Sequence, residues 1–171
     1  MALVIVADSA EELRAQVAGQ LAMAGHEVRQ AEDGALALLE IAQQEPQVLV
    51  IELTLARVPG LEVLRILHEE GLARNTRIVV YTNETHSFHV RRALNLGAHR
   101  VLEKAEPPEA VVDVVHEQLE ILGVAVPALG TPQIGAGEPQ MVTRDLSFSF
   151  GIGGGPPGGR SLPVSDLPDP A

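Results

Sequence analysis

The sequence predicts an α/β fold built on a doubly wound parallel sheet, and three observations lead to this prediction. Short runs rich in β-branched residues, such as Leu3–Val6 and Val48–Ile51, are continuous rather than alternating, which is typical of strands covered on both faces. Stretches long enough for helices separate these runs, and glycine or proline marks many of their ends. The apolar runs also lead into polar residues, which indicates a shared site at one edge of the sheet.

Five strand–helix units are predicted within residues 1–122. The predicted strands and helices alternate along the chain and cover residues 2–7, 10–24, 26–30, 33–44, 47–52, 60–71, 77–82, 85–96, 99–103 and 107–121. Right-handed crossovers between such units give a doubly wound sheet. We expect five parallel strands in the flavodoxin-like order 2-1-3-4-5, which is one of the common arrangements.

Capping and breaking residues define the first two helices. Ser9 stands just before the first helix and is predicted to be its N-cap, ahead of an acidic first turn. Gly25 is placed to end that helix. The short strand over 26–30 follows. The second helix is predicted to close before Pro46, because a residue that precedes proline avoids the helical conformation.

Glycine and proline also bound the last three helices, and valine-rich apolar runs lie between them as strands. Gly60 follows a proline at the predicted start of the third helix, and Gly71 terminates it. Gly97 follows the fourth helix in the same way. Pro107 and Pro108 suit the start of the last helix, where a missing amide hydrogen is tolerated.

Composition changes sharply near Gly123. Residues 1–122 hold 6 glycines and 4 prolines, whereas residues 123–171 hold 10 glycines and 8 prolines. We therefore expect one domain over residues 1–122 and a disordered Gly/Pro-rich tail over residues 123–171. Phe148 and Phe150 form an alternating apolar pattern within that tail. This pattern is either an unstructured stretch or a short segment that docks by strand addition.

Composition also excludes several classes of function. The formal net charge is −11 and no basic stripe offsets it, so we expect no direct binding to nucleic acid. The absence of cysteine excludes disulfides and thiolate metal sites and is typical of a reducing compartment. No apolar stretch approaches the roughly 20 residues that span a bilayer, and no signal peptide is evident. We expect a cytoplasmic protein without membrane association.

Polar residues follow four of the predicted strands where each strand ends. These residues are Asp8, Glu52, Thr82 and Lys104. Because the carboxyl ends of parallel strands share one edge of the sheet, we expect their side chains to converge. The sequence therefore predicts a site with two carboxylates, a hydroxyl and an ammonium.

With these landmarks, residues 1–122 resemble the receiver domain of two-component response regulators. The resemblance rests on features in the family's order, namely Asp8, Glu52, the Gly60–Leu64 run, Thr82, the Gly97-Ala98 pair and Lys104. It implies a role in signal transduction. It also implies that a residue pair at Ala7 and Asp8 and an acceptor at Glu52 correspond to the family's Mg²⁺ and phosphoryl site.

Two departures from the family affect that site directly. Ala7 replaces one member of the acidic pair, and Glu52 stands where the family has its phosphoacceptor aspartate. The oxygen donors left for a metal are Asp8, Glu52 and a backbone carbonyl near Thr54. The extra methylene of Glu52 shifts its oxygen by about 1.5 Å, a displacement that can cost ~100-fold in a positioned reaction. We expect no cofactor and weak or absent Mg²⁺ binding.

Further departures affect the family's switch. Val101 stands at the aromatic switch position, so no aromatic ring there can move when Thr82 reorients. Ala105 replaces a proline whose peptide bond is cis in the family. A cis bond without proline costs roughly 2.5–4 kcal/mol, so we expect the bond between Lys104 and Ala105 to be trans.

Glu52 and Lys104 are predicted to form an ion pair. An acyl phosphate on aspartate would carry negative charge toward the lysine and the threonine hydroxyl, and a glutamate reaches part of that way. Asp8 would compete for the same ammonium. In a partly buried site such a pair serves geometry more than net stability. The alternative is that Glu52 points into solvent.

The predicted function is a pseudo-receiver that acts independently of phosphorylation as a protein–protein interaction module in signal transduction. We expect no enzymatic activity. Because no output domain is expected after residue 122, the chain is expected to act by contact with a signalling protein. Two alternatives are a conventional phosphoryl-accepting response regulator in a phosphorelay and a structural dimerisation module.

A homodimer interface is predicted on the face formed by the fourth helix, fifth strand and fifth helix. Opposite charges on that face would set the register of a symmetric contact. The residues are His89, Arg91, Arg92 and Arg100 against Glu106, Asp113, Glu117 and Glu120. His86 and His89 are three residues apart on the predicted fourth helix. Without an evident third ligand, we interpret them as a solvated helix face rather than a metal site.

Overall fold

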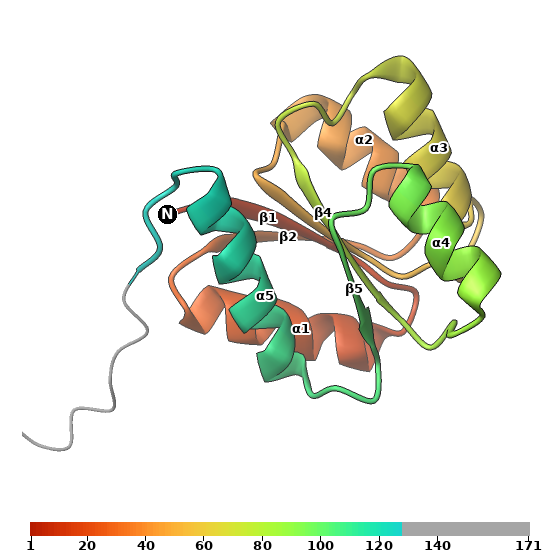
Figure 1. The fold of residues 1–171 in the computed structure, drawn as a ribbon. Coiled ribbons are helices and arrows are strands. Elements are labelled where there is room, and N and C mark those ends of the chain that lie inside the picture. Colours follow the sequence, from red (N-terminus) through yellow and green to blue (C-terminus); the bar gives the residue numbers. More distant parts are fainter. Residues whose placement is uncertain (128–171) are drawn as a thin grey trace, which may run out of the picture. The chain divides into compact units, whose positions relative to one another are not determined.

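The computed structural model describes residues 1–127 and contains in this range a five-stranded parallel sheet with five helices. The strands are β1 (Leu3–Ala7), β2 (Glu27–Ala31), β3 (Val48–Ile51), β4 (Arg77–Thr82) and β5 (Arg100–Glu103). The helices are α1 (Glu11–Met23), α2 (Gly34–Gln44), α3 (Gly60–Glu70), α4 (Ser87–Asn95) and α5 (Pro108–Ile121). The strand order is β2-β1-β3-β4-β5 and all pairings are parallel, so the predicted fold class and order are confirmed (Figure 1).

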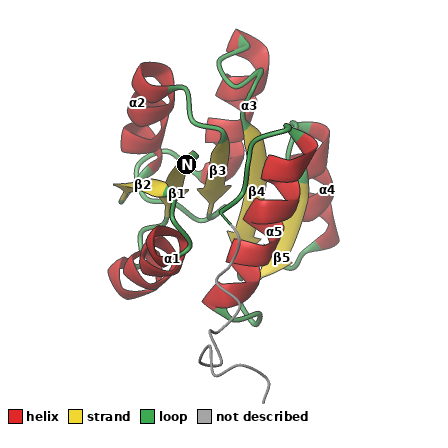
Figure 2. Ribbon diagram, turned by 90° about the vertical axis from the view of Figure 1, so that its left-hand side faces the viewer, coloured by secondary structure: helices red, strands yellow, loops and turns green. Residues whose placement is uncertain are grey.

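Helices cover both faces of the sheet (Figures 1 and 2). α1 and α5 lie together on one face, and α2, α3 and α4 lie on the other. In β3, Leu49 and Ile51 pack toward α2, α3 and α4, whereas Val48 and Val50 pack toward α1 and α5. This double coverage explains why the strand is a continuous apolar run. Each such buried side chain contributes about 1.5–3 kcal/mol through burial.

The predicted N-cap of the first helix is wrong. Ala10 occupies the N-cap position of α1 and provides no side-chain cap. Ser9 Oγ instead donates a hydrogen bond to the Glu32 carbonyl (3.0 Å) and accepts one from the Ala56 amide (2.9 Å). The hydroxyl therefore joins two loops that are distant in sequence, which no local capping pattern reveals. The Asp8 side chain accepts from the Ala10 amide (2.8 Å) beside the helix start.

The other helix boundaries agree closely with the prediction. Gly25 and Gly71 have positive φ angles of 90° and 64° just after α1 and α3, as expected for helix ends. The largest difference is α4, which begins at Ser87 rather than at residue 85. The Glu84 carboxylate accepts a hydrogen bond from the His86 amide (3.0 Å), and this contact holds the segment before the helix in a turn.

Packing continues past residue 122, where the domain was expected to end. The Val124 amide donates to the Leu119 carbonyl (2.9 Å), and Val124 and Val126 pack against the cluster under α1 and α5. The predicted tail, including Phe148 and Phe150, lies outside the described residues from residue 128 onward. Over residues 1–127, none of the helices has the length and apolar character needed to cross a membrane.

Candidate functional site

The four polar side chains predicted to converge do meet at the carboxyl edge of the sheet. Asp8 follows β1, Glu52 follows β3, Thr82 ends β4 and Lys104 follows β5. Ala7 pairs with Ile51 in the parallel ladder, which brings Asp8 and Glu52 level on neighbouring strands. Thr82 pairs with Glu103, and the Lys104 amide donates to the Thr82 carbonyl (2.9 Å). Strand register therefore places all four residues together.

Lys104 joins the two carboxylates. Its Nζ lies 2.7 Å from Asp8 Oδ2 and 2.6 Å from Glu52 Oε2. The side chains of Lys104 and Asp8 are each 8% exposed, and that of Glu52 is 3% exposed. The predicted Glu52–Lys104 ion pair is therefore present in a buried setting. Asp8 shares the ammonium with Glu52 instead of displacing it.

The second oxygen of Glu52 is held by donors from the loop after β3 and from the last residue of β4. Oε1 accepts hydrogen bonds from the Leu53 amide (2.6 Å), the Thr54 amide (3.2 Å) and the Thr82 hydroxyl. Thr82 Oγ1 in turn accepts from the Glu84 amide (3.0 Å). The carboxylate thus contacts β4 and β5 at once. The two backbone amides were not part of the predicted site, because any residue type can supply them.

The carboxylate oxygens of the cluster are all engaged by donors from within the chain. Asp8 Oδ1 accepts from the Ala10 amide (2.8 Å), so every carboxylate oxygen of Asp8 and Glu52 already has a donor. The position beside Asp8 is the buried methyl group of Ala7. Mg²⁺ requires near-octahedral oxygen coordination and usually retains several waters. The Lys104 ammonium instead supplies the positive charge between these carboxylates.

Burial and hydrogen bonding act in opposite directions on the ionisable groups. Burial alone would raise the pKa of Glu52, but the hydrogen bonds from Lys104 and Thr82 outweigh it, and the pKa lies below its ordinary value. Burial would lower the pKa of Lys104, but its bonds to Asp8 and Glu52 outweigh burial and raise the pKa. Both groups are therefore held in their charged forms at neutral pH.

The backbone around Glu52 is close-packed against the start of α3. The Gly60 amide donates to the Leu53 carbonyl (2.8 Å). A Cβ atom on Gly60 would lie 2.2 Å from the Glu52 carbonyl oxygen, a separation that cannot occur without backbone movement. Only glycine allows this approach. Gly60 therefore fixes the loop that presents the two amides to the Glu52 carboxylate.

The positions predicted to form a switch lack an aromatic ring on β5. Val101 is half-buried and packs against the cluster under α2, α3 and α4. The peptide bond between Lys104 and Ala105 is trans, as predicted, since residues 1–127 contain no cis bonds. The aromatic residue near the site is Tyr81 of β4. Its side chain is buried and its hydroxyl donates to the Glu106 carbonyl (2.7 Å), a contact that was not predicted.

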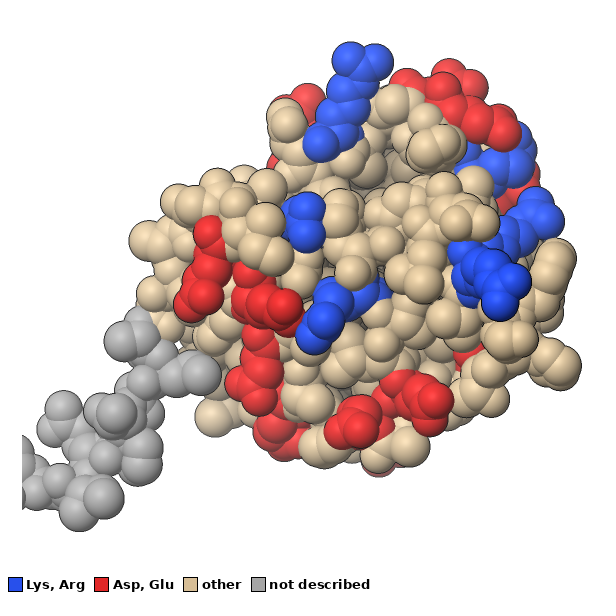
Figure 3. Space-filling model, in the orientation of Figure 1, with Lys and Arg blue, Asp and Glu red and all other residues tan. Residues whose placement is uncertain are grey.

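The predicted interface residues lie on α4, β5, the following loop and α5. Their side chains are exposed except that of His89, which is partly exposed. Arg100 already pairs with Glu117 of the same chain at 3.1 Å. Two of the charged residues that were expected to face a second copy therefore have a partner within the chain. In Figure 3, acidic side chains gather over α5 and cationic ones over α4. The homodimer itself stays a prediction.

The imidazole rings of His86 and His89 lie near each other, with their centroids 6.3 Å apart. His86 occupies the N-cap position, outside the helix in which both were placed. The His89 imidazole pairs with Glu84 at 3.3 Å, an acidic partner that the spacing of the histidines alone did not indicate. Within residues 1–127, no group of three or more candidate ligands is arranged to hold a metal ion.

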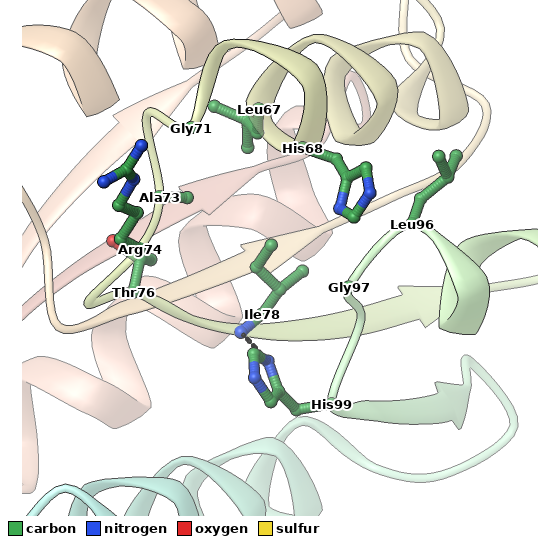
Figure 4. A pocket seen from close by; sticks show the side chains of 10 residues that line it. All are labelled: Leu67, His68, Gly71, Ala73, Arg74, Thr76, Ile78, Leu96, Gly97 and His99. Carbon is green, nitrogen blue, oxygen red and sulfur yellow. Dashed lines mark hydrogen bonds between the residues drawn. The ribbon is translucent and has the colours of Figure 1, made fainter.

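A small cavity of about 220 Å³ lies at the other end of the sheet (Figure 4). His99 just precedes β5, and its Nδ1 accepts a hydrogen bond from the amide of Ile78 at the start of β4 (2.9 Å). The last turn of α3 and the end of α4 border the cavity through His68 and Leu96. Helix C-termini favour cations, and Arg74 lines the cavity beside the end of α3. The cavity is separate from the Glu52 site.

A family model described as the response regulator receiver domain matches residues 4–116. The response regulator MprA of Mycolicibacterium vanbaalenii is 30% identical over 146 residues, which cover 85% of this chain and 59% of that protein. The protein-glutamate methylesterase/protein-glutamine glutaminase 6 of Anaeromyxobacter dehalogenans is 32% identical over 116 residues, covering 68% of this chain and 32% of that protein. The chain thus spans less than two thirds of the length of either relative.

Solved structures show the same likeness. The chemotaxis protein CheY4 of Vibrio cholerae superimposes with a TM-score of 0.65 at 26% sequence identity. The match covers 70% of this chain and 99% of the CheY4 chain. The shared part therefore corresponds to the sheet and helices described above.

Proposed function

This chain belongs to the response regulator receiver domain family, and on that premise we propose that it acts without phosphorylation. It is then a pseudo-receiver, a protein–protein interaction module of signal transduction. The observation that carries this proposal is the saturation of the Glu52 carboxylate by Lys104, Thr82 and two backbone amides. An attack by Glu52 on a phosphoryl donor would first have to break these contacts.

Weak or absent Mg²⁺ binding is part of the same proposal. Phosphoryl transfer depends on positioning and on cations that neutralise the charge of the transferred group. Here the Lys104 ammonium offsets one of the two negative charges of Asp8 and Glu52, and the Ala7 side chain adds no oxygen. Mg²⁺ would have to displace that ammonium and would still find few protein oxygens. The phosphoryl-accepting alternative is therefore the less favoured one.

A permanently held Thr82 explains how such a module would work. Thr82 donates to Glu52 and accepts from the Glu84 amide, so the loop before α4 is tied to the carboxylate. A covalent signal would normally shift the equilibrium between two conformations of such a loop. In this proposal the Glu52 carboxylate favours one conformation of the loop at all times. The partner surface is then presented without a covalent signal.

Enzymatic activity is not part of the proposed function. The methylesterase activity in the name of one relative belongs to that protein, and the match covers 32% of it. We propose that this chain binds a signalling protein by contact. Homodimerisation through α4, β5 and α5 is a second mode of contact, favoured by basic side chains over α4 and acidic ones over α5 (Figure 3). Sedimentation in low and high salt tests it, and a monomer in both would contradict it.

Incubation with acetyl phosphate and Mg²⁺, followed by intact-mass measurement, tests the central proposal. We expect no mass gain in the natural chain. A double variant, Ala7→Asp with Glu52→Asp, restores the family's residue types at both positions and is expected to gain one phosphoryl group. A phosphoryl group mapped to Glu52 or Asp8 of the natural chain would show that the proposed function is wrong.

A further inference from the structure

A groove between α3 and α4 carries an exposed aromatic ring beside several arginines. Its volume is about 350 Å³, and it is lined by Arg65 and Glu69 of α3, Phe88, Arg91 and Arg92 of α4, and Leu96. The Phe88 side chain is 64% exposed. The ring borders a groove that Leu96 also lines, and exposed apolar surface next to charged residues is typical of an interaction site. The groove therefore offers apolar contact area next to positive charge.

Arg91 and Arg92 have no ion pair or side-chain hydrogen bond within residues 1–127. Most other cations in this range have a partner: Arg29, Arg57, Arg65, Arg100 and Lys104 pair with carboxylates, and Arg14 and Arg77 bind glutamine side chains. Arg74, on another part of the surface, is the third arginine without a partner in the described range. In a chain of net charge −11, these two adjacent guanidinium groups stand out, although Glu62 of α3 is close enough to Arg92 to interact electrostatically with it.

We propose that this groove is the docking site for an acidic segment of a partner protein. An aliphatic or aromatic side chain of that segment would pack on Phe88 and Leu96, and its carboxylates would bind Arg91 and Arg92. Arginine matches carboxylates through bidentate hydrogen bonds, and aromatic residues with arginine dominate binding energy at interfaces. This site rests on the proposed function, because it names the surface and the partner class of the interaction module.

Other occupants fit the groove less well. A nucleic acid would need a continuous positive track for its backbone, whereas this groove offers Arg91 and Arg92 beside Glu69 on a strongly acidic chain. A second copy is the rival occupant, because the homodimer through α4, β5 and α5 would set Arg91 and Arg92 against acidic residues of α5. One of these, Glu117, already pairs with Arg100 of its own chain, and self-association is an outcome of the test below. An acidic segment that includes an apolar side chain complements both features at once.

The groove is connected to the Glu52 site through Glu84. The Glu84 amide donates to Thr82 Oγ1, which contacts Glu52. The Glu84 carboxylate pairs with His89, and the His89 ring lies 5.6 Å from the Phe88 ring between centroids. The loop that Glu52 fixes therefore also positions the first turn of α4. These contacts link the Glu52 site to the helix turn that carries Phe88.

The test uses the full chain and three fluorescein-labelled synthetic peptides of equal length. The first alternates Asp or Glu with Leu, the second replaces its Leu residues by Ser, and the third replaces its acidic residues by Gln and Asn. We expect the first to bind at least tenfold more tightly than the others and to weaken with salt. In ¹⁵N-labelled protein, it is expected to shift the amide signals of Phe88, Arg91 and Arg92.

Variants locate the binding. Phe88→Ala and the double variant Arg91→Glu with Arg92→Glu are each expected to weaken binding of the first peptide at least tenfold. Arg74→Glu is the matched control, since it removes an unpaired arginine elsewhere, and is expected to change affinity less than twofold. All substituted residues are exposed, so the variants are expected to keep the fold, which circular dichroism checks.

Four results would overturn the docking site. They are the absence of binding by the first peptide, equal weakening by Arg74→Glu, equal or tighter binding of a single-stranded oligonucleotide of the same charge, and self-association that the double arginine variant abolishes. Each is distinguishable from failure of the proposed function. A phosphoryl group found on Glu52 would contradict the pseudo-receiver proposal, but the effects of the variants on peptide binding would still stand. Absence of peptide binding would contradict the docking site, but the result of the acetyl phosphate experiment would still stand.

Discussion

Glu52 and Lys104 form a buried ion pair across two strands of the sheet, with Oε2 and Nζ separated by 2.6 Å. Because Lys104 also contacts Asp8, the pair belongs to a three-member charge cluster. Replacing one member of such a cluster leaves a buried charge without its partner. The resulting loss of folding free energy is larger than the net stability that the intact pair contributes. This asymmetry leads to the first two predictions.

Glu52→Gln is expected to lower the free energy of unfolding by roughly 1–3 kcal/mol, because the amide is neutral and cannot accept from all of its present donors. Urea unfolding followed by circular dichroism measures this change. The variant is also expected to weaken partner binding, because Thr82 loses its anionic acceptor. If neither the stability nor the affinity changes, the pair has no function.

Lys104→Met is expected to destabilise the fold more strongly, by about 3–5 kcal/mol, because two buried carboxylates lose their shared cation. The same change frees Asp8 and Glu52 for another cation. We therefore expect millimolar Mg²⁺ to raise the melting temperature of this variant but not that of the natural chain. Stabilisation of both proteins to the same extent would contradict the view that Lys104 occupies the cation position.

Acid is expected to destabilise the protein through Glu52. Because its pKa in the folded state lies below the ordinary value of 4.5, its contribution is fully present above about pH 4.5. That contribution is lost as the pH falls through the folded-state pKa. Unfolding free energies measured from pH 6 to 3 are expected to fall less steeply in Glu52→Gln. Parallel curves for the two proteins would refute this role.

A second pH dependence is predicted from His26 and His116, whose Nε2 atoms lie 2.9 Å apart in the core. Burial lowers both pKa values, a charged His116 and the N-terminal amine lower that of His26 further, and Asp113 and Glu120 oppose the shift at His116. The unfolded chain therefore takes up protons first, and stability falls as the pH drops below about 6.5. We expect a loss of roughly 1 kcal/mol by pH 5.5, which His116→Gln should reduce.

Gly60→Ala is expected to destabilise the protein by about 1–3 kcal/mol, because the new methyl group collides with the Glu52 carbonyl. The loop that supplies the Leu53 and Thr54 amides would have to move. Gly19→Ala is the control, since nothing lies within 4 Å of its added Cβ inside α1. That change is expected to stabilise by about 0.5–1 kcal/mol. Thermal unfolding compares them, and equal effects would argue against the close approach at Gly60.

Much of the fold could be predicted because its signals are local. Continuous β-branched runs such as Val48–Ile51 identify buried parallel strands, and Gly25 and Gly71 mark helix ends by their conformational freedom. The same apolar runs also place four polar residues at strand ends, namely Asp8, Glu52, Thr82 and Lys104. Their convergence required only that parallel strands share one carboxyl edge.

The remaining features depend on contacts between distant segments. Ser9 binds the loops at Glu32 and Ala56 instead of capping its helix, and His26 meets His116 from the far end of the chain. No short-range pattern specifies such partners, since they form only when packed helices and strands bring the side chains within hydrogen-bond distance. Sequence patterns were enough to predict the parallel strands and the residues at their carboxyl edge, and they favoured the strand order that the structure confirms. Only the tertiary structure decided that Lys104 is shared by both carboxylates and that Phe88 faces outward, because strand register and helix packing set those distances.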